Sequence, residues 1–259
     1  MFDTHAHLDF DDFESDRDEV VARASRAGVS FIIDPGCDVE TSRTAIALSD
    51  RYETVYAAVG IHPNSTADAV PGDSAEIARL ASNPNVVAIA ETGLDFYRDR
   101  APREVQLRAF RGQLDLARSL DLPVIIHFRA VELDGIELTG PGLFKGIRGV
   151  FHCFGGSVGF AEKVVSMGFH VGFDGPLTYL NSDRVEVAQA VPLDRCLIET
   201  DAPFLTPRRY RGRRNEPAFI ADVAEKLAEV KQVDVDEVIE ITTRNACGLF
   251  GIGEKKAEQ

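Results

Sequence analysis

Short apolar runs recur along this 259-residue chain and alternate with segments of helical periodicity. The segments 15–28, 39–52 and 102–120, for example, combine charged residues with a helical apolar period. Such alternation predicts βαβ units and a parallel sheet. The runs are continuous rather than alternating, which indicates a sheet that is buried on both faces. They lie near residues 2–8, 29–36, 55–61, 86–91, 122–127, 149–154, 169–173 and 196–200.

The number of runs and the chain length favour one closed barrel. Eight strand–helix units fit a single (β/α)8 TIM barrel, which takes about 250 residues. An open doubly wound sheet is the alternative, but no GxGxxG opens a helix after the first run. Two further helical patterns, at 216–230 and 234–250, would complete the barrel. We therefore expect one domain over residues 1–259, with a flexible tail after about residue 252.

Residues that can bind metals stand where several of these runs end. His5 and His7 form an HxH pair, and residues two apart in a strand point to the same face. In a parallel barrel the carboxyl ends of the strands share one rim, and active sites lie there. The pattern is therefore typical of a metal-dependent hydrolase. The six candidates are His5, His7, Glu91, His127, His152 and Asp201.

Each of these candidates also has a structural interpretation. Glu91 ends a very apolar run, where a carboxylate is costly to bury unless a cation accompanies it, although it could lie in a solvated loop. A lone histidine in apolar surroundings is more often a satisfied core residue than a ligand. His127 and His152 end two successive runs, however, and two such residues together favour a metal site.

The charge distribution gives a mixed indication about nucleic acid. The net charge is −14, which argues against tight and extended binding because such binding depends on phosphate neutralisation. A local cluster has the opposite sign and could capture a phosphate, although a solvated loop is the alternative. It consists of Arg208, Arg209, Arg211, Arg213 and Arg214.

The chain shows no signs of secretion or membrane insertion. Its start lacks a basic region followed by a long apolar stretch, and no apolar run approaches the roughly 20 residues that span a bilayer. The four cysteines form no CxxC pair and suit buried thiols in a reducing compartment. We therefore expect a cytoplasmic protein.

Short motifs along nearly the whole chain share a family order. They include DTHAHLDF (3–10), GIHP (60–63), GLDFYR (93–98), GVFHCFGGS (149–157), ETDAPFL (199–205), RGRRNEP (211–217) and NACGLFG (245–251). The chain resembles the TatD family of metal-dependent deoxyribonucleases, within the amidohydrolase-like barrels. The resemblance implies that the same six strand-end residues are the metal ligands. It also implies a nucleic acid substrate, and the charge pattern favours single-stranded DNA ends.

The chain departs from the family pattern after His127. The family usually continues with an acid and then Ala at the third and fourth positions, where this chain has Ala130 and Val131. Arg129 and Asp134 remain, and the segment 135–149 is rich in glycine where a regular helix would be expected. We expect a changed pocket wall and substrate preference, with the metal site unaffected.

These residues suggest a two-metal phosphodiesterase mechanism. One ion would be held by His5, His7 and Asp201, and Glu91 would bridge to a second ion. Asp201 is also the candidate base that takes a proton from the attacking water. His127 and His152 complete the second site. The proposed substrate contacts are His62, Arg129, Arg211, Arg213 and Arg214, with His62 equally open to being a bystander.

The metal and the substrate stay open at this stage. Four imidazoles favour Zn, Mn or Co over Mg, although Mg with retained waters is possible. An amide, ester or lactone hydrolase acting on a small molecule shares the ligand set. Two features favour the nuclease. The bridging position holds Glu91, whereas many small-molecule hydrolases of this type have a lysine there that needs carboxylation, and the arginine cluster suits a polyanion. A non-catalytic scaffold is disfavoured because all six ligands are present. DNA versus RNA, cleavage position, oligomeric state and pathway are undetermined.

Overall fold

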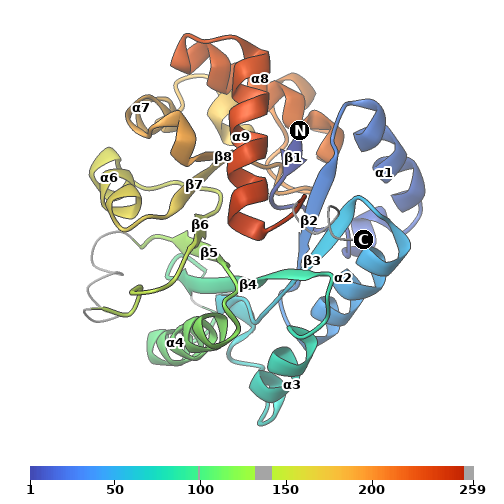
Figure 1. The fold of residues 1–259 in the computed structure, drawn as a ribbon, viewed down its shortest axis with the longest axis vertical. Helices are drawn as coiled ribbons and strands as arrows, with labels where there is room; N and C mark the ends of the chain where they lie inside the picture. The colour runs from blue at the N-terminus through green and yellow to red at the C-terminus, as the bar shows by residue number, and fades with distance from the viewer. Residues whose placement is uncertain (99, 132–141, 254–259) are drawn as a thin grey trace.

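A computed structural model describes residues 1–98, 100–131 and 142–253 of the chain. One eight-stranded sheet runs in chain order, and each strand is parallel to the next. Figure 1 shows the strands at the centre with helices around them. The predicted TIM barrel is confirmed. The strands are β1 (Phe2–Asp3), β2 (Phe31–Pro35), β3 (Val55–Val59), β4 (Val86–Asp95), β5 (Val124–Arg129), β6 (Gly149–Phe151), β7 (His170–Phe173) and β8 (Cys196–Ile198).

The ring closes just beyond the paired residues of β1 and β8. The backbone N–H of Asp201 donates to the carbonyl of His5 at 2.9 Å, and that of His7 donates to the carbonyl of Ala202 at 2.8 Å. The first and last strands therefore meet where three of the predicted ligands stand.

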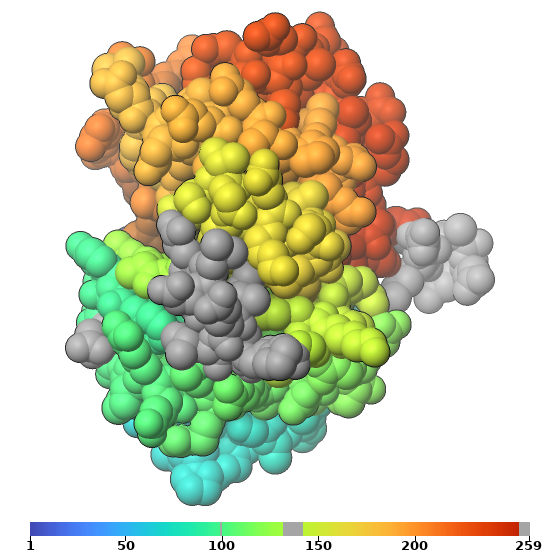
Figure 2. Space-filling view, turned by 90° about the vertical axis from the view of Figure 1, so that its left-hand side faces the viewer, coloured from blue at the N-terminus to red at the C-terminus, as the bar shows by residue number. Residues whose placement is uncertain are grey.

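Helices cover the outside of the sheet. In Figure 2, α6 (yellow) lies between α4 (green) below and α7 (orange) above. The α-helices are α1 (Arg17–Arg26), α2 (Val39–Arg51), α3 (Asp73–Leu80), α4 (Arg103–Leu120), α6 (Val158–Ser166), α7 (Arg184–Ala190), α8 (Ile220–Lys231) and α9 (Val235–Phe250). The short 3-10 helices are η1 (Asp11–Phe13), η2 (Pro63–Ser65), η3 (Gly175–Thr178), η4 (Leu193–Arg195), η5 (Arg208–Tyr210) and η6 (Pro217–Phe219).

Local sequence explains where several of these helices begin. The Asp38 side chain accepts from the Thr41 backbone N–H at 2.8 Å, and the Thr41 hydroxyl accepts from the Asp38 N–H at 2.9 Å. This reciprocal capping box satisfies two backbone donors that the first turn of α2 leaves free. Ser157 caps α6 in a similar way, with its hydroxyl accepting from the Phe160 N–H at 3.3 Å.

One apolar cluster fills the barrel interior at the amino-terminal ends of the strands. It contains inward side chains such as Ile33, Ala58 and Leu197, together with Leu249 and Phe250 from the end of α9. Figure 1 shows α9 running across the ring. The last helix therefore closes one end of the barrel and leaves the carboxyl ends of the strands for polar residues.

The predicted metal ligands on β5 and β6 follow residues of this interior cluster at the spacing of two that keeps side chains on one face of a strand. On β5, Ile125 belongs to the interior cluster, and His127 follows two residues later. Val150 on β6 belongs to the same cluster, and His152 again follows two residues later. Because residues two apart share a face, both histidines point into the barrel above the apolar layer.

Some sequence predictions concern residues outside the described ranges. The flexible tail falls on 254–259, and Asp134 lies within the undescribed segment 132–141. Residues 142–149 of the glycine-rich stretch are described. Phe144 and Ile147 in this part are buried in the larger apolar cluster, which contains residues of the helices and strands. Within the described ranges, no helix has both the length and the apolar character to cross a membrane.

Candidate metal centre

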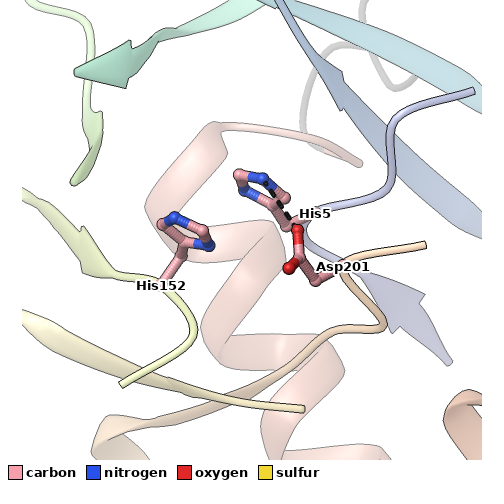
Figure 3. Close-up of side chains that lie close together, drawn as sticks. All are labelled: His5, His152 and Asp201. Atoms are coloured by element: carbon pink, nitrogen blue, oxygen red, sulfur yellow. Dashed lines mark ion pairs between the residues drawn. The ribbon is translucent and has the colours of Figure 1, made fainter. Parts of the chain in front are cut away.

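Four donor atoms converge at the meeting point of β1, β4 and β8. The Nε2 atoms of His5 and His7 lie 3.3 Å apart, and each lies 3.6 Å from Oε2 of Glu91. Oδ1 of Asp201 lies 3.7 Å from Nε2 of His5 and 3.8 Å from Nε2 of His7. Figure 3 shows Asp201 and His5 directed at each other, with the His152 ring beside them. The residues predicted for the first ion therefore lie together.

A second group of donor atoms gathers on the other oxygen of Glu91. Oε1 lies 2.9 Å from Nδ1 of His127 and 2.8 Å from Nε2 of His152. These two nitrogens lie 3.1 Å apart. The two oxygens of Glu91 thus face separate histidine groups, as a carboxylate between two ions would.

The donor set fits a divalent cation. A tetrahedral shell with bonds of about 2.0–2.2 Å has edges of about 3.3–3.6 Å, close to the spacings in the first group. The nitrogens of His5, His7 and His152 that converge with the carboxylate oxygens are Nε2 atoms, whereas their Nδ1 atoms, on the other side of each ring, are buried and have no hydrogen-bond partner among the described residues. Lone pairs on imidazoles and carboxylates that converge in this way repel one another unless a cation lies between them.

Burial keeps His5 and His7 of the first group, and His152 of the second, in the neutral form. It lowers the pKa of His5 and His152 to about 4 and that of His7 to about 3. Neutral imidazole is the form that binds metals. Burial opposes protonation of His127 as well, but hydrogen bonds to Asp95 and Glu91 outweigh it and raise its pKa to about 9. In the absence of a metal, this ring therefore carries the positive charge that balances Glu91.

The two carboxylates of the centre have opposite electrostatic surroundings. Burial would raise the pKa of Glu91, but the neighbouring His62 and His152 outweigh it and hold that pKa well below its usual range. Burial and the negative charge of Glu91 raise the pKa of Asp201 well above its usual range. Asp201 also has a left-handed backbone, with φ of 54°, which is uncommon for a side-chain-bearing residue. Glu91 is the permanent anion, and Asp201 has the higher proton affinity.

Two further carboxylates contact the outer nitrogens of the second group. Oδ2 of Asp95 lies 3.5 Å from Nε2 of His127, and Oε1 of Glu199 lies 3.7 Å from Nδ1 of His152. A carboxylate in this position orients a ligating histidine and sets its tautomer where the two form a hydrogen bond. At 3.7 Å the Glu199 carboxylate acts on His152 through its charge. Sequence reasoning assigned neither Asp95 nor Glu199 a role, although they stand in the GLDFYR and ETDAPFL motifs.

A glycine on β7 makes room for Glu199. A Cβ atom on Gly172 would lie 2.7 Å from Oε2 of Glu199. The Thr4 hydroxyl donates to the same oxygen at 3.2 Å, and the Cys153 backbone N–H donates to Oε1. The inward position of β7 thus carries no side chain because a carboxylate from β8 fills that space.

A buried ion pair lies next to Asp201 and was also missed from the sequence. The Arg184 guanidinium donates to Oδ1 of Asp174 at 2.6 Å, and its two terminal nitrogens lie 3.8 and 3.9 Å from Sγ of Cys153. Asp174, Cys153 and Asp201 have donor atoms within 4.8 Å of one another. Arg184 therefore balances an acidic group behind the first cluster. No local pattern marked Asp174 or Arg184 in the sequence.

His62 lies beside the second group as a hydrogen-bond donor. Its Nδ1 accepts from the Asn64 backbone N–H at 3.0 Å, which places the ring proton of the neutral tautomer on Nε2. This Nε2 lies 3.5 Å from Oε1 of Glu91. The tautomer favours donation to an oxygen over metal ligation.

The arginine cluster after β8 divides into paired and exposed members. Both terminal nitrogens of Arg214 contact the Asp16 carboxylate at 2.8 Å, and its guanidinium lies 4.5 Å from the Phe13 ring centre. These contacts give Arg214 a structural role. Arg209 lies 4.0 Å from Asp222 and is also 67% exposed. Arg208, Arg211 and Arg213 are exposed, and the Arg211 guanidinium lies 5.3 Å from the ring centre of Tyr179.

Arg129 stands apart from that cluster, on the side of the second group. It ends β5, two residues after His127, and is exposed. Its guanidinium lies 4.3 Å from the ring centre of Tyr97. Exposed cations therefore stand in two separate segments, at the end of β5 and in the loop after β8.

Known proteins resemble this chain along nearly its whole length. A model of the family described as TatD related DNase matches residues 2–251. The chain belongs to the TatD family. The resemblance of the sequence motifs is confirmed, and the protein is a metal-dependent hydrolase of this family.

Relatives within the TatD family cover almost the whole chain. The uncharacterized metal-dependent hydrolase YabD of Bacillus subtilis is 41% identical, over 97% of this chain and 99% of its own. The 3'-5' ssDNA/RNA exonuclease TatD of Erwinia amylovora is 36% identical, over 97% of this chain and 100% of its own. The crystal structure of the TatD homologue YjjV from Escherichia coli superposes with a TM-score of 0.91 and 32% identity, covering 97% and 98% of the two chains.

Proposed function

We propose that this protein is a two-metal phosphodiesterase that shortens single-stranded ends of DNA or RNA. The position of Glu91 carries the proposal, because its two oxygens face separate groups of donor atoms. The relative from Erwinia amylovora is named a 3'-5' ssDNA/RNA exonuclease, and this name supports the choice of substrate. A single hydrolase domain over residues 1–259 and a cytoplasmic location stay as predictions that accompany it.

The residues present define which side chains would hold the ions. His5, His7 and Asp201 would bind one, His127 and His152 would bind the other, and Glu91 would bridge them. Two divalent ions in such a site lower the pKa of a bound water and stabilise the attacking and leaving oxygens. Zn, Mn and Co suit the four imidazoles best, and Mg is the further candidate.

The side chains of the chain then position the substrate and move its protons. Asp201 accepts the proton of the attacking water, because its carboxylate borders the first donor group. His62 donates from Nε2 to a phosphate oxygen beside the second group. Arg129, Arg211 and Arg213 attract the phosphate backbone, because a guanidinium pairs with phosphate oxygens in a fork.

The test is a substrate panel with metal-depleted protein resupplied with one ion at a time. End-labelled single-stranded DNA, single-stranded RNA and a blunt duplex are compared with a neutral aryl ester. We expect stepwise shortening of the single strands and little cleavage of the duplex. Hydrolysis of the ester without cleavage of any oligonucleotide would instead establish the alternative, a small-molecule hydrolase.

A further inference from the structure

Two exposed aromatic side chains flank the metal centre. Among the described residues, Tyr97 and Phe204 are the aromatic members of the exposed large apolar set, with 67% and 49% of their surfaces accessible. Tyr97 follows β4 by two residues, and Phe204 follows Asp201 by three. Both stand in loops at the carboxyl ends of strands, where a barrel binds its substrate.

Phe204 is connected to the first donor group through another ring. The Phe10 ring stacks on the His7 ring with centres 4.5 Å apart and planes 23° apart. Phe204 meets Phe10 edge to face with centres 5.9 Å apart. The Phe204 backbone N–H also donates to the carbonyl of Asp201 at 2.9 Å. A line of aromatic rings therefore runs outward from a predicted ligand of the first ion.

Tyr97 is connected to the second donor group. Its backbone N–H donates to Oδ1 of Asp95 at 3.0 Å, and the other oxygen of Asp95 lies 3.5 Å from His127. The Arg129 guanidinium lies over the Tyr97 ring. An aromatic face and a cation therefore stand together in the segment linked to the second donor group, whereas Phe204 is linked to the first.

We propose that Phe204 with Phe10, and Tyr97 with Arg129, form two nucleobase-stacking subsites, one on each side of the scissile phosphate. The inference rests on the proposed nuclease function and deepens it. Stacking on an aromatic ring strengthens binding by about 5- to 150-fold per base and tolerates any base, because every base has a π face. A base in a duplex already stacks on its neighbours, so these subsites select single strands.

The charges around the two platforms agree with this occupant. Arg129 lies on one ring, and the exposed Arg211 and Arg213 belong to the loop that also carries Phe204. An aromatic face next to a guanidinium matches a base next to its phosphate. An apolar peptide would leave these cations without a partner.

Binding of abasic oligonucleotides tests the proposal. Short phosphorothioate single strands, each lacking one base at a defined position, are titrated against metal-loaded protein by fluorescence anisotropy. We expect wild-type protein to lose roughly tenfold in affinity at two separate positions. Phe204→Ala should remove the loss at one position and Tyr97→Ala at the other, whereas Tyr97→Phe should behave as wild type.

Leu180→Ala is the matched control, because Leu180 is 68% exposed in the loop after β7 and has no aromatic ring. It should retain both losses. The proposal is overturned if Phe204→Ala and Tyr97→Ala discriminate base from abasic positions as wild type does, or if wild type does not discriminate at all. A failure of the proposed function differs from this, because it would appear as uncleaved natural oligonucleotides in the substrate panel.

Discussion

The two ends of the barrel are built from the same strands but carry opposite chemistry. At the amino-terminal end, Leu197 and its neighbours pack against Leu249 and Phe250 of α9. At the carboxyl end, two residues after Leu197 and just beyond β8, Glu199 is buried beside the donor groups. The step of two residues keeps the side chain inside the barrel but moves it from an apolar contact to a charged one.

The difference shows how the barrel separates stability from chemistry. Apolar burial stabilises the closed end by roughly 25 cal/mol per Å². The open end holds buried carboxylates, and imidazole nitrogens that have no hydrogen-bond partner in the described part of the chain, and both destabilise the metal-free protein. Substitutions at the two ends should therefore affect different measurements.

The largest effect should follow a change in the centre that leaves the closed end intact. Asp201→Ala should lower phosphodiesterase turnover by about 10²-fold or more, because it removes both a ligand and the candidate proton acceptor. The melting temperature of the metal-free protein should not fall, because a carboxylate that is only 14% exposed is removed from acidic surroundings. His5→Ala and His127→Ala should likewise lose most activity while staying folded. Retention by Asp201→Ala of more than about a tenth of wild-type activity, a loss under ~1.4 kcal/mol, would refute its role.

A change at the closed end should lower stability and leave metal binding intact. Phe250→Ala removes a ring that is 5% exposed and lies 6.1 Å from the Phe2 ring. Denaturant unfolding should show a loss of about 3–5 kcal/mol. The remaining folded protein should bind metal as wild type does. A loss of metal binding with unchanged unfolding would show that the two ends are not separate.

The next effect concerns Glu91, the proposed bridge between the two donor groups, and the number of metal ions bound. Glu91→Ala should lower the occupancy of both ions, measured by elemental analysis after dialysis against a limiting metal concentration, whereas His127→Ala should mainly lower one. The reason is that each oxygen of Glu91 faces a different histidine group. Absence of any contact from Glu91 to metal in a metal-loaded crystal structure would contradict the bridge.

The arginine loop allows a smaller test at the open end. The double variant Arg211→Ala/Arg213→Ala should raise KM for oligonucleotides and flatten its salt dependence, by a slope of about 0.7 for each lost phosphate contact. Arg209→Ala, in the same loop but beside Asp222, is the matched control and should change the slope less. An unchanged oligonucleotide KM, with hydrolysis of a small substrate impaired, would favour the small-molecule hydrolase.

The smallest effect concerns an ion pair that fastens this loop to the start of α1. Hydrogen bonds from Arg214 and Arg23 lower the pKa of Asp16 to about 2. A carboxyl with a lowered folded-state pKa adds stability above its unfolded value of about 3.9, and this stability is lost as the pH falls towards 2. Asp16→Asn should therefore cost up to about 1 kcal/mol at pH 7 and little at pH 2. An equal loss of unfolding free energy at both pH values would contradict this assignment.

The sequence by itself determined the barrel and the positions that could hold metals. The eight apolar runs and their helical partners are local patterns with periods set by backbone geometry, so they can be recognised without the fold. The ends of those runs identified His5, Glu91, His127 and the other candidates, because every parallel strand ends on the same rim. The bounds of β4, which extends to Asp95, exceeded the predicted run at 86–91.

Only the tertiary structure decided how these side chains pair. The orientation of Glu91 between two groups, and the contact of Glu199 with His152 at 3.7 Å, depend on strands that are distant in sequence. Arg214 meets Asp16 across 198 residues of chain, which separates it from its exposed neighbours in the arginine loop. A single sequence records which residues are present but not which partner neutralises each charge. Which groups pair depends on the distances between their side chains, and these distances are fixed only when the barrel closes.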